Sequence, residues 1–346
     1  MNSSDLTIAI VGATGAVGTI ALDLLAERNH PAERIRAMAS SRSAGKQIAY
    51  GNGTLEIIEA TPDSFEDVDV AFISASSEVS KQLAPEAVKR GALVIDDGSA
   101  YRMEPTVPLV VPEVNGADVE WHEGIISIPN CTTTPLVMVL KALSEISPIT
   151  AVTAATYQAV TGTGAAADRE LMDQSKAIVN DGEFSIEQYP HQIAFNVLPQ
   201  VDDFLADGYT KEEQKMLNES RKILHLPDLR LTSTCVRVPV QVSHSEAVTV
   251  EFQDGVSIAE ARSKLAGAAG VELVDEPENS LYPMPLSSAG QDGVYVGRVR
   301  EDIAHDNGIT LWLSCDNLRK GAALNALQIL DEVLRRDCLK PVAATR

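Results

Sequence analysis

The chain has little cysteine, little histidine and little positive charge. Its four cysteines, Cys131, Cys235, Cys315 and Cys338, are far apart in the sequence, which excludes a zinc knuckle and a disulfide framework. The six histidines are equally scattered, so we predict no metal site. No apolar run is long enough to cross a membrane, and no signal-like segment precedes the first apolar strand. We therefore expect a cytoplasmic protein.

Positive charge is scarce relative to negative charge. The 346 residues include 28 Lys and Arg against 49 Asp and Glu, a formal net charge of −21. This balance argues against binding to nucleic acid or to an anionic membrane. It also means that an anionic small-molecule substrate would need local Arg or Lys side chains, against the overall field.

The first half of the chain alternates between apolar strands and helices. Such alternation is typical of a Rossmann-type parallel sheet with helices on both faces. The expected strands cover residues 6–11, 35–39, 68–73, 93–95 and 125–128, and helices cover 17–27 and 79–90.

The second half is richer in β structure, which predicts an α+β domain with a mostly antiparallel sheet. Its last element is an amphipathic helix over residues 320–336, with leucines at helical spacing. We expect this helix to pack back on the first domain, giving a Rossmann-type domain of residues 1–130 and 318–346 and a second domain of residues 131–317. The expected strands are 151–160, 231–242, 247–252, 294–300 and 309–315, and the helices are 166–180, 211–224 and 257–268.

A glycine-rich turn follows the first strand and precedes the first helix. Gly12, Gly15 and Gly18 have the spacing G-x-x-G-x-x-G in the strand–turn–helix context that a dinucleotide requires. Small residues let the backbone approach a pyrophosphate, whose charge the helix N-terminus receives. A tight turn without a ligand is the alternative. The expected contacts are Gly12, Thr14, Gly15, Ala16 and Val17.

The end of the second strand indicates which dinucleotide binds. An NAD site usually has an acidic residue there, whereas this chain has Ser40, Ser41 and Arg42. Hydroxyls and a guanidinium suit a 2′-phosphate, so we predict NADP over NAD. None of the seven tyrosines has a lysine four residues later, which argues against the short-chain reductases that also open with such a turn.

Cys131 is the candidate nucleophile. It lies where an apolar strand ends and a helix begins, and the positive end of a helix favours a thiolate. The polar neighbours Asn130 and Thr132 to Thr134 are poor core material, which speaks against the alternative of a buried structural cysteine. A poised thiol together with a nucleotide site suggests oxidation or reduction through a thioester.

Two further residues fit such chemistry. His244 lies in a polar break between two β runs and could carry the proton that a thiol nucleophile requires; a turn histidine is the alternative. Arg237 lies within an apolar strand, where a charge needs a partner, and a substrate carboxylate would supply one. An internal salt bridge is the alternative for Arg237.

Ten motifs in one order extend over essentially the whole chain. They cover residues 12–18, 96–103, 111–115, 129–133, 157–162, 194–200, 212–215, 237–240, 244–246 and 316–323. With these motifs the chain resembles the aspartate-β-semialdehyde dehydrogenase family. The resemblance implies NADPH-dependent reductive dephosphorylation of L-4-aspartyl phosphate to L-aspartate 4-semialdehyde, in lysine, threonine, methionine and diaminopimelate biosynthesis. It also implies a homodimer or homotetramer.

The resemblance implies a role for individual residues. Cys131 would be the nucleophile, His244 the acid/base, and Gln158 the residue that orients the acyl group. Arg237 would hold the substrate carboxylate and Glu212 would face the substrate amine. The remaining implied contacts are Lys215, Arg102 and Asn130 with phosphate, and Thr161, Gly162 and Asn317 with the cofactor.

The sequence departs from the family pattern in three places, which affects fine cofactor geometry. Thr132 stands where serine is common, Ala75-Ser76-Ser77 replaces a glycine-rich stretch, and residues 161–164 replace the commoner S-G-A-G. Two alternatives stay open. One is a related reductase of the N-acetylglutamyl-phosphate type, and the other is a catalytically silent nucleotide-binding scaffold.

Overall fold

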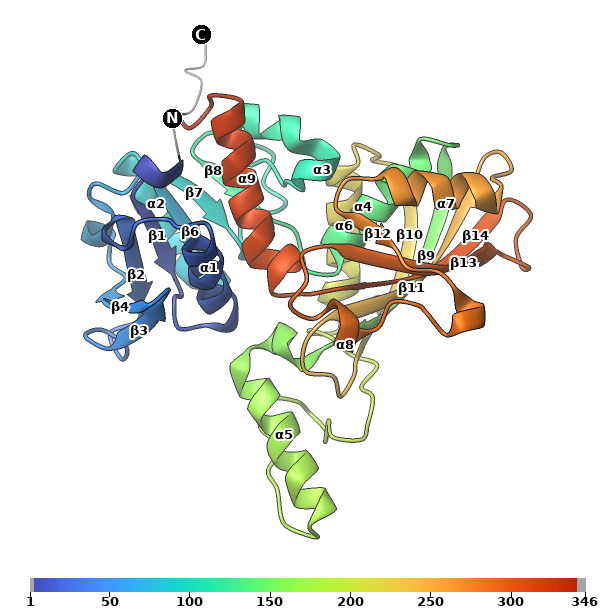
Figure 1. The fold of residues 1–346 in the computed structure, drawn as a ribbon, viewed down its shortest axis with the longest axis horizontal. Helices are drawn as coiled ribbons and strands as arrows, with labels where there is room; N and C mark the ends of the chain where they lie inside the picture. The colour runs from blue at the N-terminus through green and yellow to red at the C-terminus, as the bar shows by residue number, and fades with distance from the viewer. Residues whose placement is uncertain (1–2, 341–346) are drawn as a thin grey trace. The chain divides into compact units, whose positions relative to one another are not determined.

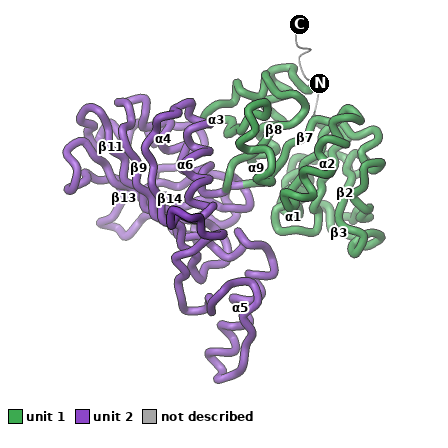
Figure 2. Tube along the Cα trace, turned by 180° about the vertical axis from the view of Figure 1, so that it is seen from behind, with its two compact units in different colours: residues 1–130, 322–346 green, residues 131–321 purple. Residues whose placement is uncertain are grey.

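The computed structural model describes residues 3–340, which form two compact units (Figure 2). The first unit comprises the described residues up to Asn130 and those from Ala322 onward, and the second runs from Cys131 to Gly321. Among the described residues, no helix is both long enough and apolar enough to span a membrane.

The first unit is built on a six-stranded parallel sheet of order β5-β2-β1-β6-β7-β8. Its central strands are short, apolar and fully buried, as in sheets covered on both faces. The predicted Rossmann-type sheet is therefore confirmed. The strands are β1 (Ile8–Val11), β2 (Ile35–Ala39), β5 (Ile58–Glu59), β6 (Val70–Ile73), β7 (Leu93–Asp96) and β8 (Ile125–Ser127).

Helices cover both faces of this sheet (Figure 1). Helices α1 (Ala16–Glu27) and α9 (Leu324–Arg335) share one hydrophobic cluster with one face of the strands. Helix α2 (Ser77–Lys89) packs on the other face. A π-helical turn, η7 (Arg319–Ala323), precedes α9, so the regular helix begins later than the predicted residue 320.

The chain order reverses at β1, which lies between β2 and β6. Such a reversal opens a crevice at the carboxyl ends of the strands, where open α/β sheets bind ligands. The remaining elements of the unit are η1 (Ser3–Asp5), η2 (Ala32–Arg34), the hairpin of β3 (Gln47–Tyr50) and β4 (Gly53–Glu56), η3 (Pro62–Phe65), α3 (Pro112–Asn115) and η4 (Gly116–Trp121).

The second unit contains a mixed six-stranded sheet of order β10-β9-β11-β14-β13-β12. The three central pairings are antiparallel and the two outer pairings are parallel, which refines the predicted mostly antiparallel sheet. The strands are β9 (Ile149–Gln158), β10 (Arg230–Arg237), β11 (His244–Phe252), β12 (Val271–Leu273), β13 (Val294–Glu301) and β14 (Gly308–Cys315).

Three helices cover the inner face of this sheet: α4 (Thr133–Ser144), α6 (Lys211–Ile223) and α7 (Ile258–Gly267). Helix α8 (Pro285–Ser288) contacts β14, and the turns η5 (Val160–Thr163) and η6 (Pro277–Asn279) connect elements. Helix α5 (Ala165–Val179) projects away from the sheet (Figure 1). Alternate residues of the central strands are buried, as a sheet with one covered face requires.

Two strand limits differ from the sequence prediction by three residues or more. β10 ends at Arg237 rather than at residue 242, because Pro239 has no N–H to continue a ladder. β11 begins at His244 rather than at residue 247, so this histidine is part of the sheet. Both differences bring charged or polar side chains to the ends of paired strands.

Gly18 should be irreplaceable in the first turn of α1. A Cβ at this position would lie 2.2 Å from the carbonyl oxygen of Gly12. We expect Gly18→Ala to destabilise the first unit by about 1–3 kcal/mol, the usual cost of overpacking, and to weaken dinucleotide binding. The control is Gly267→Ala, where nothing lies within 4 Å of the added carbon. Thermal unfolding and cofactor titration are measured for both variants. Equal unfolding temperatures and equal cofactor affinities would contradict the prediction.

Candidate active site

Four inward-facing side chains lie side by side at one end of the second sheet. β9 pairs with β10 so that Gln158 lies opposite Arg237. β11 pairs with β14 so that His244 lies opposite Cys315. Because β9 and β11 are neighbours, His244 also lies next to Gln158. All four residues are buried, and we call them the terminal row.

His244 is fully buried at the first position of β11. The backbone N–H of Ala159 donates to Nδ1 at 3.0 Å, so the neutral imidazole has its proton on Nε2. Burial, and then the nearby Arg237 charge, hold the pKa of His244 well below 6.5. Among the described residues Nε2 has no hydrogen-bond partner. His244 is therefore a neutral group with an N–H to donate.

Arg237 ends β10 and is only 5% exposed. Its Nη1 donates to the carbonyl oxygen of Ala159 at 2.6 Å, and its guanidinium lies 6.0 Å from the centre of the Tyr189 ring. Within the described part of the chain no carboxylate pairs with it, and its Nε is unpartnered. A buried guanidinium with free donor capacity fits an anionic ligand better than an internal salt bridge.

A chain of hydrogen bonds runs outward from Gln158. The hydroxyl of Thr156 donates to Gln158 Oε1 at 3.0 Å, and Gln158 Nε2 donates to Glu212 Oε1 at 3.1 Å. Lys215 then donates to Glu212 Oε2 at 3.1 Å and to Asp202 Oδ2 at 2.7 Å. These bonds fix the orientation of the Gln158 amide and connect the terminal row to α6.

Cys131 lies directly before Thr132, the residue that precedes α4, and is partly exposed. The predicted position at a helix start is confirmed, and the positive end of a helix stabilises negative charge there. A Cβ on Gly321 would lie 3.0 Å from Cys131 Cβ, so glycine permits this close approach. Burial raises the pKa of the Cys315 thiol, with Cys131 among the smaller causes. The N–H of Gly321 also donates to the carbonyl oxygen of Asp316 at 3.1 Å, and Asp316 directly follows Cys315, so Cys131 lies close to the terminal row.

Three residues expected to contact the cofactor lie around His244. Asn317 accepts from the N–H of Ser243 at 2.9 Å and donates to Thr161 Oγ1 at 3.2 Å. A Cβ on Gly162 would lie 2.9 Å from Arg237 Nη1 and 3.2 Å from His244 Nε2. Only glycine therefore leaves this face of the histidine and arginine open.

The glycine-rich turn of the first unit connects β1 to α1. Thr14 and Gly15 are exposed between β1 and α1, with Ala16 and Val17 in the first turn of the helix. That turn has neither a side-chain cap nor an acidic residue, so its N–H groups can receive a phosphate. A Cβ on Gly12 would lie 2.1 Å from the carbonyl oxygen of Ser74, so the turn must pack this closely.

Ser40, Ser41 and Arg42 are exposed directly after β2. β2 is the parallel neighbour of β1, so this segment and the glycine-rich turn leave the same edge of the sheet. The two segments together offer backbone donors, hydroxyls and a guanidinium. This donor set fits a dinucleotide that has an additional phosphate.

Arg102 and Asn130 are buried in the first unit, at 6% and 8% exposure. Arg102 Nη2 donates to the carbonyl oxygen of Asp97 at 2.8 Å. Burial raises the pKa of Asp97, and it raises the pKa of Asp96 to about 6 despite a hydroxyl donor from Ser80. Asp96 and Asp97 therefore keep their protons to a higher pH than exposed aspartates do.

The structure thus gathers Gln158, Arg237, His244, Glu212 and Lys215 in the second unit, while Arg102, Asn130 and the nucleotide segments belong to the first. Sequence reasoning missed Ala159, Asp202, Thr156 and Glu246. Alternation along β9 and β11 could have placed Thr156 and Glu246 inward. No sequence signal identified Ala159, which acts through its backbone.

Glu246 is a buried acid in the row beneath His244. It pairs across the sheet with Thr156 on one side and Leu313 on the other. Its side chain is fully buried, and neither carboxyl oxygen has a partner among the described residues. Burial raises the pKa of Glu246 well above 4.5. The folded protein therefore favours the protonated, neutral form of Glu246.

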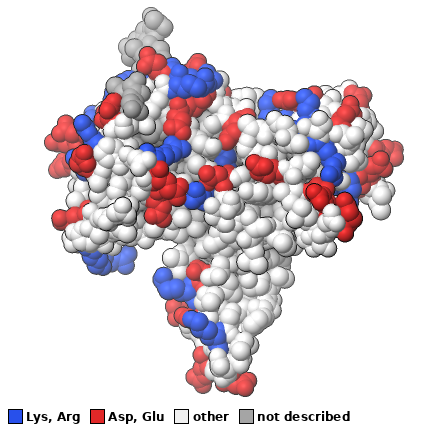
Figure 3. All heavy atoms as spheres, in the orientation of Figure 1, with Lys and Arg blue, Asp and Glu red and all other residues white. Residues whose placement is uncertain are grey.

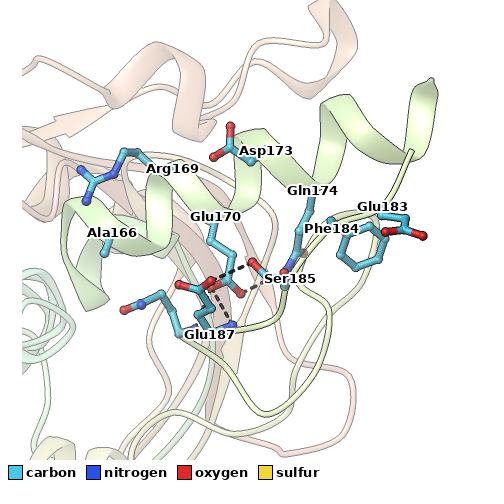
Figure 4. Close-up of a pocket in the computed structure, with 10 residues that line it drawn as sticks. Ala166, Arg169, Glu170, Asp173, Gln174, Glu183, Phe184, Ser185 and Glu187 are labelled. Carbon is cyan, nitrogen blue, oxygen red and sulfur yellow. Dashed lines mark hydrogen bonds between the residues drawn. The ribbon is translucent and has the colours of Figure 1, made fainter. Parts of the chain in front are cut away.

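A separate hollow of about 410 Å³ lies between α5 and the segment of residues 183–188 (Figure 4). Its central acid, Glu170, accepts from the N–H groups of Glu187 and Gln188 at 3.0 and 2.7 Å. These bonds anchor the segment to α5. We therefore interpret Glu170 as structural.

Both halves of the chain match family models. The model described as "Semialdehyde dehydrogenase, NAD binding domain" matches residues 7–122. The model described as "Semialdehyde dehydrogenase, dimerisation domain" matches residues 140–320. The two matches agree with the order of a nucleotide unit followed by a second unit.

Whole proteins are also similar to this chain. Aspartate-semialdehyde dehydrogenase of Bacillus subtilis (strain 168) is 46% identical over 336 residues, 95% of this chain and 97% of that protein. The structure of aspartate semialdehyde dehydrogenase II from Vibrio cholerae, complexed with ASA, is 39% identical with a TM-score of 0.92, covering 95% and 98% of the chains. The enzyme from Candida albicans with NADP is 26% identical with a TM-score of 0.75, covering 96% and 99%.

Neutral Glu246 should make stability depend on pH. Above 4.5 the unfolded carboxyl loses its proton while the folded one keeps it, so the free energy of unfolding falls as pH rises. The contribution is at most about 1.4 kcal/mol per pH unit. Glu246→Gln should remove this slope and stabilise the protein at neutral pH.

The measurement is denaturant unfolding from pH 5 to pH 8, with Glu251→Gln as the control on the outer face of the same strand. Equal slopes in the wild type and Glu246→Gln would contradict the prediction.

Proposed function

The chain belongs to the aspartate-semialdehyde dehydrogenase family, and from that premise we propose that it reduces L-4-aspartyl phosphate to L-aspartate 4-semialdehyde. NADPH is oxidised and inorganic phosphate is released, and the reaction is reversible. It serves lysine, threonine, methionine and diaminopimelate biosynthesis. The observation that carries the proposal is the terminal row, in which Gln158, Arg237 and His244 are buried side by side near Cys131.

We assign NADP binding to the first domain, residues 1–130 and 318–346, and catalysis and dimerisation to residues 131–317. The segments around Gly12 and Ser40 to Arg42 would hold the cofactor, and Thr161, Gly162 and Asn317 would lie at its nicotinamide end. NADP is also the cofactor named with the Candida albicans structure. When bound, NADPH supplies the hydride that reduces the acyl group.

Cys131 begins the reaction. Its thiolate attacks the acyl carbon of the substrate, so that a C–S bond forms, the C–O bond to phosphate breaks, and a thioester results. Reduction converts the thioester to a hemithioacetal. The C–S bond then breaks, which releases the aldehyde and restores the thiolate.

His244 stabilises the oxygen of the reacting carbonyl by hydrogen bonding. Its Nδ1 is occupied by the Ala159 N–H, so only Nε2 can exchange a proton with the substrate. The neutral imidazole donates this N–H to the oxygen that becomes negative in each tetrahedral intermediate. The low pKa of His244 keeps this donor neutral at physiological pH.

The remaining residues orient the substrate. Arg237 would bind its carboxylate with the donors left over from the Ala159 bond. Glu212 would attract its amine, and Gln158 would hold the acyl group. Lys215, Arg102 and Asn130 would contact phosphate. A free amine and carboxylate distinguish this substrate from that of an N-acetylglutamyl-phosphate reductase, and the close relatives do not favour that alternative or a silent scaffold.

We also propose that the enzyme works in the cytoplasm as a homodimer, with a homotetramer as the alternative. Within the described part of the chain, none of the four cysteines forms a disulfide, as a reducing compartment favours. An apolar hollow of about 680 Å³ includes Leu171, Met172, Phe195 and Leu286, and mostly uncharged side chains cover the surface beside α5 (Figure 3). Such a patch is typical of a protein interface.

Cys131→Ser should abolish turnover without weakening NADP binding, because a hydroxyl is a far weaker nucleophile than a thiolate. The measurement is phosphate-dependent NADPH production from aspartate semialdehyde, with cofactor affinity titrated in parallel. Cys235→Ser is the control, since this buried thiol faces the core. Wild-type turnover in Cys131→Ser would end the thioester mechanism.

Leu286→Asp should shift the enzyme toward monomers, because a charge would be buried at the proposed interface. Leu286 is 93% exposed in the isolated chain. Ile303→Asp is the matched control, since Ile303 is equally exposed but lies in the turn between β13 and β14. Analytical ultracentrifugation showing both variants with unchanged mass would count against this interface.

A further inference from the structure

Lys215 is held between two carboxylates rather than one. Its Nζ lies 3.1 Å from Glu212 Oε2 and 2.7 Å from Asp202 Oδ2. Both acids contribute to raising the pKa of Lys215, against the effect of burial, so the lysine is a cation at physiological pH. The three groups together carry a net charge of −1. The two carboxylates therefore more than balance the positive charge of Lys215 before a phosphate binds.

The two carboxylates differ in how firmly they are held. The Glu212 side chain is 6% exposed and also accepts from Gln158 at 3.1 Å. The Asp202 side chain is 31% exposed and belongs to a loop rather than to a helix or strand. Moving Glu212 would break the hydrogen-bond chain to the terminal row, whereas moving Asp202 would not.

Hydrogen bonds nevertheless fix the position of Asp202. The segment that carries Asp202 is anchored to β10, because Leu198 and Arg237 exchange two backbone hydrogen bonds, at 2.8 and 2.9 Å. The other oxygen of Asp202 accepts from the N–H of Asp203 at 2.8 Å, and its backbone adopts a positive φ of 67°. These constraints aim one carboxyl oxygen at Lys215.

We propose that Asp202 is a built-in competitor of phosphate at Lys215. Its carboxylate holds the ammonium in place in the empty site and yields it to the phosphate group of the substrate. The inference rests on the proposed role of Lys215 in binding phosphate. Asp202 then sets the affinity for phosphate, while the chemical step at Cys131 and the binding of the semialdehyde do not depend on it.

The chain contains a matched control one residue away. Asp203 pairs with Lys211 at 2.6 Å, one helical turn before Lys215 on α6. The two side chains of this pair are 75% and 51% exposed. Asp203→Asn therefore removes the same charge from the same loop and leaves Lys215 between its two acids.

The test is steady-state kinetics of the full-length enzyme with semialdehyde, NADP⁺ and inorganic phosphate. Asp202→Asn should lower KM for phosphate by about two- to fivefold, the size of a half-exposed ion pair. The kcat and the KM for semialdehyde should not change, and Asp203→Asn should match the wild type. Asp202→Ser offers a second neutral variant should the first fail to fold, and Asp202→Glu, which keeps the charge, should retain the high KM.

An unchanged or higher KM for phosphate in the folded neutral variants would overturn the proposal. A higher KM for semialdehyde would overturn it too, because Asp202 would then bind the substrate amine. Lys215→Met separates this inference from the proposed function. If Lys215→Met leaves KM for phosphate unchanged, the assignment of Lys215 itself is wrong. If Lys215→Met raises that KM, adding Asp202→Asn to it should have no further effect.

Discussion

The backbone of one residue, Ala159, hydrogen-bonds to the side chains of His244 and Arg237, two of the groups on which the proposed chemistry depends. Its N–H donates to His244 at 3.0 Å and its carbonyl oxygen accepts from Arg237 at 2.6 Å. Since Ala159 directly follows β9, between the strands that carry the other two residues, the sheet itself sets this geometry. The tautomer of the histidine and the direction of the guanidinium follow from the backbone N–H and C=O of Ala159, which no substitution other than proline would remove.

Burying the polar side chains of the terminal row lowers the free energy of unfolding, and the hydrogen bonds within the site offset this effect only in part. His244 Nε2 and Arg237 Nε lack partners among the described residues, although both are nearly or fully buried. Unsatisfied buried groups are destabilising by about 1–3 kcal/mol each. Such groups occur where a ligand completes the hydrogen bonding. The same buried environment keeps His244 neutral, so its Nε2–H donates a hydrogen bond and the ring does not attract an anion away from Arg237.

Much of the fold was predictable because its signals are local. The apolar strands of the first unit, the glycine-rich turn and the helix after Cys131 each follow from residues within one short segment. The limits of β10 and β11 were not predictable in the same way. The residues around Pro239 are apolar and strand-like, whereas those around His244 are polar and resemble a turn, and the pairing of each strand with its neighbours determines where its ladder begins and ends.

The sequence by itself determined the class of chemistry: a thiol at a helix start, a turn for a dinucleotide, and an arginine in an apolar strand. Tertiary structure alone decided how these groups are tuned. Residue 158 is far from residues 237 and 244 in the chain and becomes their neighbour only through strand register. Asp202 meets Lys215 only because its loop is tied to Arg237. Residue types are local information, whereas pKa values, tautomers and competing charges depend on distances between segments that the chain brings together only when it folds.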